Sequence, residues 1–149
     1  MAPQTLRFLI ASVLCFHGIG HLMGIIPGLR LFKVDASSSS WLKGWTSKSW
    51  LLNGLLGDRA ARYLCIVLFA AAFACTIAAA LAVLGWGVPH AHWRTLALIA
   101  ALLSLVSVVL YWNALMLFFP HKVGCLSVDL ATLVCLLWLN WPTEAAIGF

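Results

Sequence analysis

Four long apolar stretches, separated by polar segments, decide what this chain can fold into. They lie at about residues 8–29, 61–84, 95–119 and 123–141. A helix of about 20 residues rises about 30 Å, which is the thickness of the hydrocarbon core of a bilayer. Only 9% of the residues are charged, whereas a soluble domain has about 25%. The sequence therefore predicts an all-α fold, an integral membrane antiparallel four-helix bundle that forms a single domain over residues 1–149.

The connection at residues 30–57 has the composition of a membrane interface. Trp41, Trp45 and Trp50 occur here together with Lys43 and Lys48. Indole rings favour the headgroup layer, and lysine side chains reach out to lipid phosphates. Residues 49–56 form either a short helix on the membrane surface or an irregular loop anchored by the tryptophans.

The formal net charge of +5 fits a membrane topology better than it fits nucleic-acid binding. Arg7 and Arg94 lie on one side of the predicted bundle. Seven basic residues lie on the opposite side of the bundle. One is Lys122, and the other six belong to the first connection and the start of the second span: Arg30, Lys33, Lys43, Lys48, Arg59 and Arg62. The positive-inside rule then predicts a multi-pass protein of the bacterial inner (plasma) membrane. The first connection and the one that contains Lys122 would lie in the cytoplasm, and both termini would lie outside.

The first span carries two histidines and three glycines at helical spacing. At about 100° per residue, His21, Gly24 and Gly28 fall within roughly 40° of the direction of His17, and Gly20 lies beside them. Glycines repeated every four residues let another helix backbone approach closely. We expect this face to pack inside the bundle and the first span to be its centre.

Asp129 is the only acidic residue deep inside a predicted span. Ionisable groups in a membrane are costly, so they normally face the bundle interior and pair. At 1.5 Å per residue, Asp129 and Asn113 lie roughly 9 Å from the cytoplasmic ends of their helices and His21 lies roughly 12 Å. His17 lies one turn deeper. We expect His21 and Asp129 to meet, directly or through Asn113 or a water, where the glycines of the first span let the fourth helix come close.

Three interpretations of this polar group stay open. The side chains fix the helix register, they line a pocket for a lipid-like or quinone-like ligand, or they hold a metal or haem. A metal site of His17, His21 and Asp129 is geometrically possible, because histidines at i and i+4 can chelate one ion. A haem held between two axial ligands would need a further intramembrane histidine on the opposite side of the ring, because His17 and His21 share one face. A zinc peptidase motif, H-E-x-x-H, would need glutamate at the position of Gly18. We therefore predict no metal and no cofactor.

The five cysteines all fall in apolar segments, and no two form a C-x-x-C pair. They are best interpreted as small buried hydrophobic residues. A quinone-linked thiol oxidoreductase would need a close cysteine pair. We predict a non-enzymatic membrane protein that binds a lipid-like or quinone-like ligand in the bundle or serves as a structural subunit. The alternative is an accessory subunit of a membrane redox complex with a histidine-based metal or haem site.

The first span reads His17-Gly18-Ile19-Gly20-His21-Leu22-Met23-Gly24, and the third begins Trp93-Arg94-Thr95-Leu96-Ala97-Leu98. In these motifs the chain resembles small uncharacterised bacterial integral membrane proteins that have four predicted helices and an H-G-x-x-H-L-x-G first helix. More loosely, its layout is similar to that of the DoxX-like four-helix proteins, some of which are linked to membrane quinone oxidoreductases. The long Trp/Lys connection departs from the compact DoxX pattern. The resemblance implies the architecture, membrane lipids as partners, and no activity for any residue. A larger complex or a homo-oligomer is a further expected partner, and nucleic acid is not expected.

Overall fold

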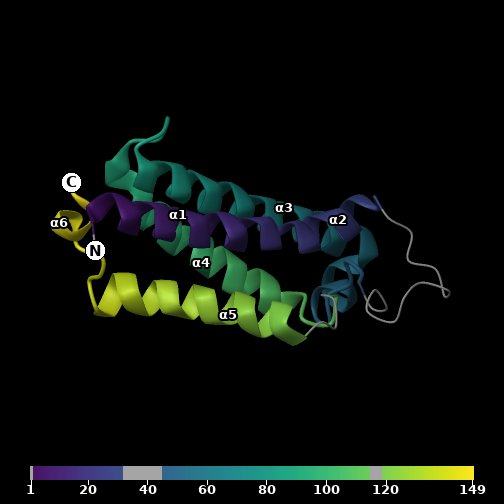
Figure 1. Cartoon of the computed structure of the whole chain (residues 1–149). Coiled ribbons are helices and arrows are strands. Elements are labelled where there is room, and N and C mark those ends of the chain that lie inside the picture. The colour runs from purple at the N-terminus through teal and green to yellow at the C-terminus, as the bar shows by residue number, and fades with distance from the viewer. Residues whose placement is uncertain (1, 32–44, 115–118) are drawn as a thin grey trace.

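The protein is a bundle of helices in the computed structural model, which describes residues 2–31, 45–114 and 119–149 (Figure 1). Four of its segments are long and apolar enough to cross a membrane: Pro3–Leu29, Leu52–Leu84, His90–Leu110 and His121–Trp138. The predicted all-α membrane fold is confirmed. In chain order, the elements are α1 (Pro3–Gly20), α2 (Leu22–Leu29), α3 (Leu52–Leu84), the 3₁₀ turn η2 (His90–His92), α4 (Trp93–Leu110), α5 (Phe119–Leu133), the π-helical η3 (Val134–Trp138) and α6 (Glu144–Ile147).

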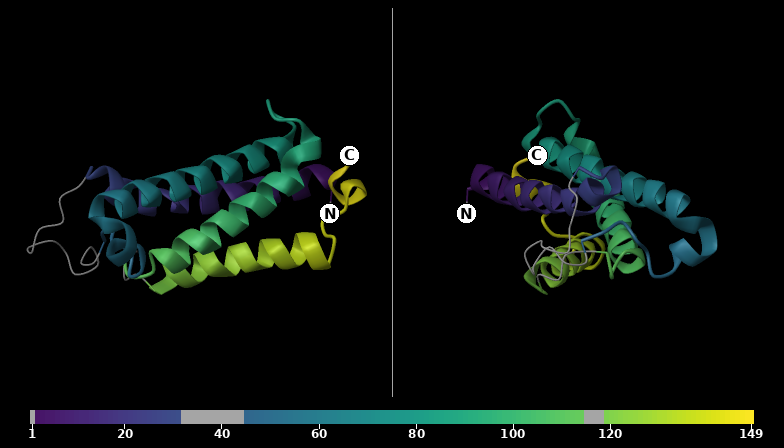
Figure 2. Two further views of the ribbon diagram at one scale, coloured as in Figure 1. Left: turned by 180° about the vertical axis from the view of Figure 1, so that it is seen from behind. Right: turned by 90° about the vertical axis from the view of Figure 1, so that its right-hand side faces the viewer.

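Helix α3 is the centre of the bundle, where we had expected the first span. It packs against α1 and α2 on one side and against α4 on the other (Figure 2). Its buried face is rich in alanine, and Ala72, Ala79, Ala80 and Ala82 are fully covered. Small side chains let neighbouring helices approach closely where no hydrophobic force drives them together. The fourth span, His121–Trp138, is the least enclosed of the four, with 11% of its most apolar 18-residue stretch buried against 28% in the first span.

The first span is broken at His21, and its last part is tied to the segment that follows it. Pro27 lies inside α2 and has no N–H to donate to the carbonyl of Met23. That carbonyl accepts a hydrogen bond from Trp45 Nε1 at 2.6 Å. Trp45 is therefore buried against α2, whereas Trp50 is exposed. Trp41 lies outside the described residues.

Helix α4 ends nine residues earlier than the predicted third span, at Leu110. The last carbonyls of a helix need donors from outside it. Leu110 O accepts from Ser49 Oγ at 2.5 Å, and Val109 O accepts from Trp50 Nε1 at 2.8 Å. The connection therefore caps α4. After the turn, α5 begins at Phe119, four residues before the predicted fourth span.

For residues 49–56 we had left open a short surface helix or an irregular loop, and the structure has a short helical stretch that begins with α3 at Leu52 and ends before Gly57. Ser49 Oγ accepts from the N–H of Leu52 at 3.1 Å, which satisfies one of the first free amides. The helix breaks at Gly57, where φ is +78° and ψ is 162°. Such a conformation favours glycine, because a side chain would clash with the backbone. The membrane span of α3 therefore begins after Gly57.

Both ends of the chain lie at the same end of the bundle (Figure 1). The Nε–H of Arg7 donates to Ile147 O, and its Nη2 donates to Gly148 O at 2.5 Å. The guanidinium also stacks on the Phe149 ring at 3.7 Å. These contacts join α1 directly to the C-terminal α6. An even number of spans places both ends of the chain on the same side, where such contacts can form.

Candidate functional site: a buried aspartate between three helices

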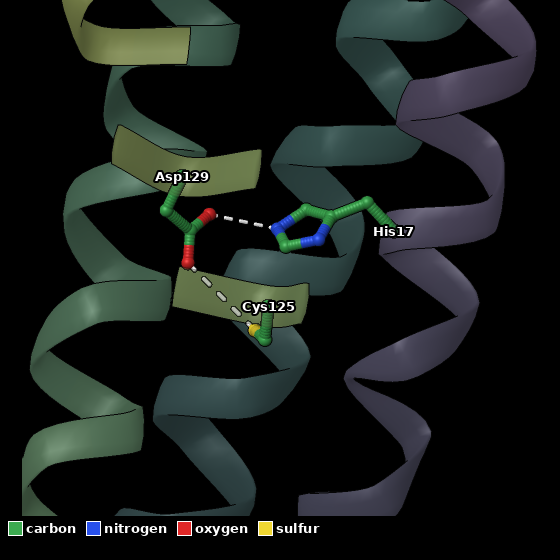
Figure 3. A group of neighbouring side chains, drawn as sticks. All are labelled: His17, Cys125 and Asp129. Atoms are coloured by element: carbon green, nitrogen blue, oxygen red, sulfur yellow. Dashed lines mark hydrogen bonds and ion pairs between the residues drawn. The ribbon is translucent and has the colours of Figure 1, made fainter. Parts of the chain in front are cut away.

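Asp129 lies on α5 and is almost completely buried, with 1% of its surface exposed. Its Oδ1 lies 2.7 Å from His17 Nε2 on α1 (Figure 3). Its Oδ2 accepts a hydrogen bond from Ser104 Oγ on α4 at 2.5 Å. Both carboxylate oxygens are thus satisfied, and one side chain joins three helices. This matches the expectation that an acidic residue in a span faces the interior and pairs.

The partner predicted for Asp129 was wrong by one helical turn: it is His17, and His21 lies elsewhere. α5 starts earlier than expected, so Asp129 is ten residues from its beginning, or roughly 15 Å. His17 is twelve residues before the end of α2, or roughly 18 Å. The His21 ring lies toward α3, 6.2 Å from the Phe69 ring and edge-on to His17 at 4.8 Å. Within the described part of the chain, buried His21 Nε2 has no hydrogen-bond partner.

Asn113, the other polar residue assigned to this layer, is not part of the site. It follows the end of α4 and is exposed, beside Trp50 and Val109 on the surface. The prediction failed because the third span was drawn too long. Ser104, two turns deeper on α4, takes the place predicted for Asn113.

Sequence reasoning missed Cys125 and His121, which lie one and two turns before Asp129 on α5. Cys125 Sγ is 3.7 Å from Asp129 Oδ2 and 3.5 Å from Ser104 Oγ. His121 and Cys125 line a groove together with His17. The signal was present in the spacing, because residues four apart share one face of a helix. The pattern H-x-x-x-C-x-x-x-D therefore places all three on the side that faces α1.

We had predicted that the glycines of the first span let α5 come close, but Gly24 and Gly28 face α3 instead. A Cβ on Gly24 would lie 2.2 Å from the Phe69 ring of α3, and one on Gly28 would lie 2.5 Å from Ile66. These two glycines therefore allow α2 to contact α3 closely. A Cβ on Gly20 would meet nothing within 4 Å. Gly20 instead lines the groove beside His17.

Two grooves adjoin the Asp129–His17 pair between α1 and α5. The first is apolar and extends toward the end of the bundle that carries the termini; Trp93 and Ala97 of α4 also line it. The second contains the polar side chains of His17, His121 and Cys125. Val13 and Val128 line both grooves, which therefore adjoin each other. An elongated apolar molecule with a polar end would match this order of surfaces.

The site can hold a proton, donate hydrogen bonds or ligate a metal. Ser104 is fully buried and donates its hydroxyl proton to the Asp129 carboxylate, so its role in this structure is to hold that carboxylate in place. His17 Nε2, Cys125 Sγ and a carboxylate oxygen of Asp129 lie within 4.8 Å of one another. All five cysteines are free thiols.

No family model, curated protein or solved structure matches this chain. The site is a buried His–Asp pair beside a groove between two helices.

Proposed function

We propose that this protein binds a neutral lipid with a compact polar head, of the quinone type, along the two adjoining grooves between α1 and α5. It carries out no chemistry of its own. The observation that supports this proposal most strongly is the order of surfaces along the groove. An apolar part leads to a part lined by two histidines, and the buried Asp129 lies behind one of them.

The depth of the site favours a quinone over a phospholipid. His17 lies near the middle of the first span, with fourteen residues before it from Pro3 and twelve after it to Leu29. At 1.5 Å per residue, both ends are roughly 20 Å away. A charged phosphate head would lose its hydration at that depth, which costs far more than burying an uncharged polar group. A neutral carbonyl-bearing ring can occupy mid-membrane.

Hydrogen-bond donors at the polar end of the groove fit a carbonyl oxygen. His17 uses Nε2 for Asp129, so Nδ1 is the nitrogen that would donate to a ligand when the ring is protonated. His121 lines the same groove and supplies a second ring. A ligand that accepts hydrogen bonds is therefore favoured over one that donates them.

We also propose that the protein lies in a bacterial inner membrane with both termini outside. Seven of the nine basic residues belong to the end that carries the connections, and only Arg7 and Arg94 belong to the other. Those two are also bound to carbonyls of the C-terminal segment. Membrane lipids cover the outer faces of the bundle. Cysteine labelling at Ser38 and Thr143 tests this orientation, which predicts that only a cysteine at position 143 reacts from outside.

Ligand binding is tested by titrating the protein in nanodiscs with a long-chain benzoquinone and following tryptophan fluorescence. Trp93 and Trp141 line the apolar groove, and a bound quinone would quench them. We expect saturable quenching that a phospholipid with chains of the same length does not compete away. Val128→Phe narrows the groove where its two parts meet and should weaken binding about tenfold, the factor that corresponds to 1.4 kcal/mol.

Val106→Phe is the matched control, because Val106 is exposed on α4 and lines neither groove. It should leave quenching unchanged. Val13→Phe, which narrows the groove from the α1 side, should reproduce the effect of Val128→Phe. If quenching is unsaturable, or if Val106→Phe weakens it as much as Val128→Phe, the quinone partitions into the lipid only. The role of a structural subunit would then replace this proposal.

A further inference from the structure

Three side chains of different chemistry converge on the inner wall of the α1–α5 groove. They are His17 Nε2 from α1 and Cys125 Sγ and an Asp129 carboxylate oxygen from α5, all within 4.8 Å of one another (Figure 3). We propose that these residues form a binding site for one divalent transition-metal ion of the zinc type. This inference does not rest on the proposed quinone binding, because the metal site can be measured with the groove empty.

The donor set selects the class of ion. Imidazole nitrogen, thiolate sulfur and carboxylate oxygen are the three ligand types that zinc takes in proteins. Calcium and magnesium prefer oxygen ligands alone, which this site does not offer. Three protein ligands with a fourth position open to a groove are the arrangement of an accessible zinc site, and a closed structural site would have four.

The charges balance only for a divalent ion. A neutral His17, a Cys125 thiolate and an Asp129 carboxylate carry two negative charges together. A 2+ ion makes the centre neutral, whereas a monovalent ion would leave one net charge. Isolated charges are very costly in an apolar medium, so the neutral assembly is the one that suits a mid-membrane site. Binding releases the thiol proton of Cys125, and the affinity should therefore rise with pH.

The geometry needs only small side-chain movements. Tetrahedral zinc with bonds of about 2.0 Å to nitrogen and oxygen and about 2.3 Å to sulfur separates its ligand atoms by about 3.3–3.6 Å. The Sγ–Oδ2 distance of 3.7 Å is close to this range, and the three ligand atoms lie within 4.8 Å of one another, so a bound ion would draw the most distant pair about 1 Å closer. The Nε2–Oδ1 distance is 2.7 Å, so the ion would replace this hydrogen bond and push the two atoms slightly apart.

Groups around the three ligands suit a metal site as well. Ser104 Oγ holds Asp129 Oδ2 at 2.5 Å, and hydrogen bonds of this kind orient a ligating carboxylate. His21, whose buried Nε2 lacks a partner within the described residues, packs edge-on against His17. His121 lies on the α5 face that carries Cys125 and Asp129 and lines the same groove. The fourth position therefore faces a polar part of the groove.

The test is to strip the purified, ligand-free protein with a chelator and titrate it with Zn²⁺ and Co²⁺. We expect about one zinc per chain by elemental analysis. Cobalt should give the visible bands of a tetrahedral site and a near-ultraviolet thiolate-to-cobalt band. Cys125→Ser should remove the thiolate band and lower zinc affinity by about tenfold or more. Cys135→Ser is the matched control on the same span and should keep both.

His17→Gln and Asp129→Asn should also lower zinc affinity, while His92→Gln should not. Circular dichroism shows whether each variant is folded. If Asp129→Asn does not fold, Cys125→Ser decides the matter, because a serine fits the space of the thiol. A folded wild-type protein that takes up neither ion, or a thiolate band that survives Cys125→Ser, overturns the metal site. Quinone quenching by the same stripped protein then shows separately whether the proposed ligand binding stands.

Discussion

Helix α1 and its continuation α2 pack against α3 on one side and face α5 on the other, and the two contacts are built from different residues. On the α3 side, Gly24 and Gly28 lie directly against Phe69 and Ile66. On the α5 side, Gly20 has open space beside it, and grooves occupy much of the boundary. The first contact is close-packed, whereas the second is held at one polar point, the pair of His17 and Asp129.

The difference shows how a membrane bundle combines rigidity with a place to bind. Close approach of small residues holds helices together in lipid, where apolar burial adds little. A helix that is instead fixed by a polar contact and by its ends can leave room along its sides. The C-terminal end of the fourth span, beyond α5, is bound through Arg94. Its Nη2 donates to Leu136 O at 3.0 Å and to Asn140 Oδ1 at 2.7 Å.

The largest effect is expected from Gly24→Leu. The new side chain would overlap the Phe69 ring, since its Cβ alone would lie 2.2 Å from that ring. We expect the free energy of unfolding to fall by about 3 kcal/mol, at the upper end of the range for overpacking. Reversible unfolding in mixed micelles measures it.

Gly20→Leu, one turn earlier, is the matched control and should change stability little, because nothing lies within 4 Å of its Cβ position. It should fill the groove and weaken quinone binding. Equal destabilisation by the two variants would show that both sides of α1 are packed alike, contrary to this comparison.

The second prediction concerns the pair that holds α1 to α5. In protein with metal chelated, a double-mutant cycle on His17→Ala and Asp129→Ala should give a coupling energy of about 1–2 kcal/mol, the upper range for polar contacts between membrane helices. The same cycle on His21→Ala and Asp129→Ala should be close to additive, because His21 is not the partner of Asp129.

A larger coupling for His21 than for His17 would restore the pairing that the sequence predicted. Ser104→Ala offers an internal check, since it removes the bond to Oδ2 and leaves His17 in place. Its effect on the free energy of unfolding should not simply add to that of His17→Ala or to that of Asp129→Ala, because the three residues belong to one hydrogen-bond network.

The third prediction concerns the end of α5. Arg94 Nη1 also donates to Pro142 O at 2.8 Å, so the guanidinium spans three acceptors. Arg94→Ala should lower the free energy of unfolding by about 1 kcal/mol. Arg94→Lys should restore little of it, because an ammonium lacks the planar fork. Full rescue by lysine would mean that charge alone matters here.

The smallest effect is expected at Glu144, next to the C-terminus. Partial burial raises its pKa, but the hydrogen bonds from His90 and Trp93 and the nearby charges outweigh this, so the pKa lies below its ordinary 4.5. A lowered carboxyl pKa contributes stability that is present above pH 4.5 and is lost as the pH falls through the lower folded-state value.

Glu144 is half exposed, so this contribution is screened by water and should stay below about 0.5 kcal/mol. Thermal melts of wild type and Glu144→Gln should differ slightly at pH 7 and converge in acid. A difference that grows as the pH falls would contradict the assigned direction.

Much of the fold could be predicted, because long apolar stretches and few charged residues are the direct requirements of a chain that crosses a membrane. The ends of the helices could not. The third span was drawn to residue 119, since its apolar composition continues beyond Leu110. What ends α4 is a set of donors from the connection, Ser49 and Trp50, which are distant in sequence. That error moved Asn113 into the site and shifted the depth assigned to Asp129.

By itself, the sequence determined that the chain crosses a membrane four times and that Asp129 needs a partner inside, because a bilayer penalises exposed backbone and unpaired charge whatever the packing. Only the tertiary structure decided that the partner is His17, that Ser104 and Cys125 join it, and that Gly24 and Gly28 face α3. Those choices depend on the rotation and stagger of each helix. In a four-helix bundle, a stagger of one turn exchanges His21 for His17, and no local sequence signal distinguishes the two.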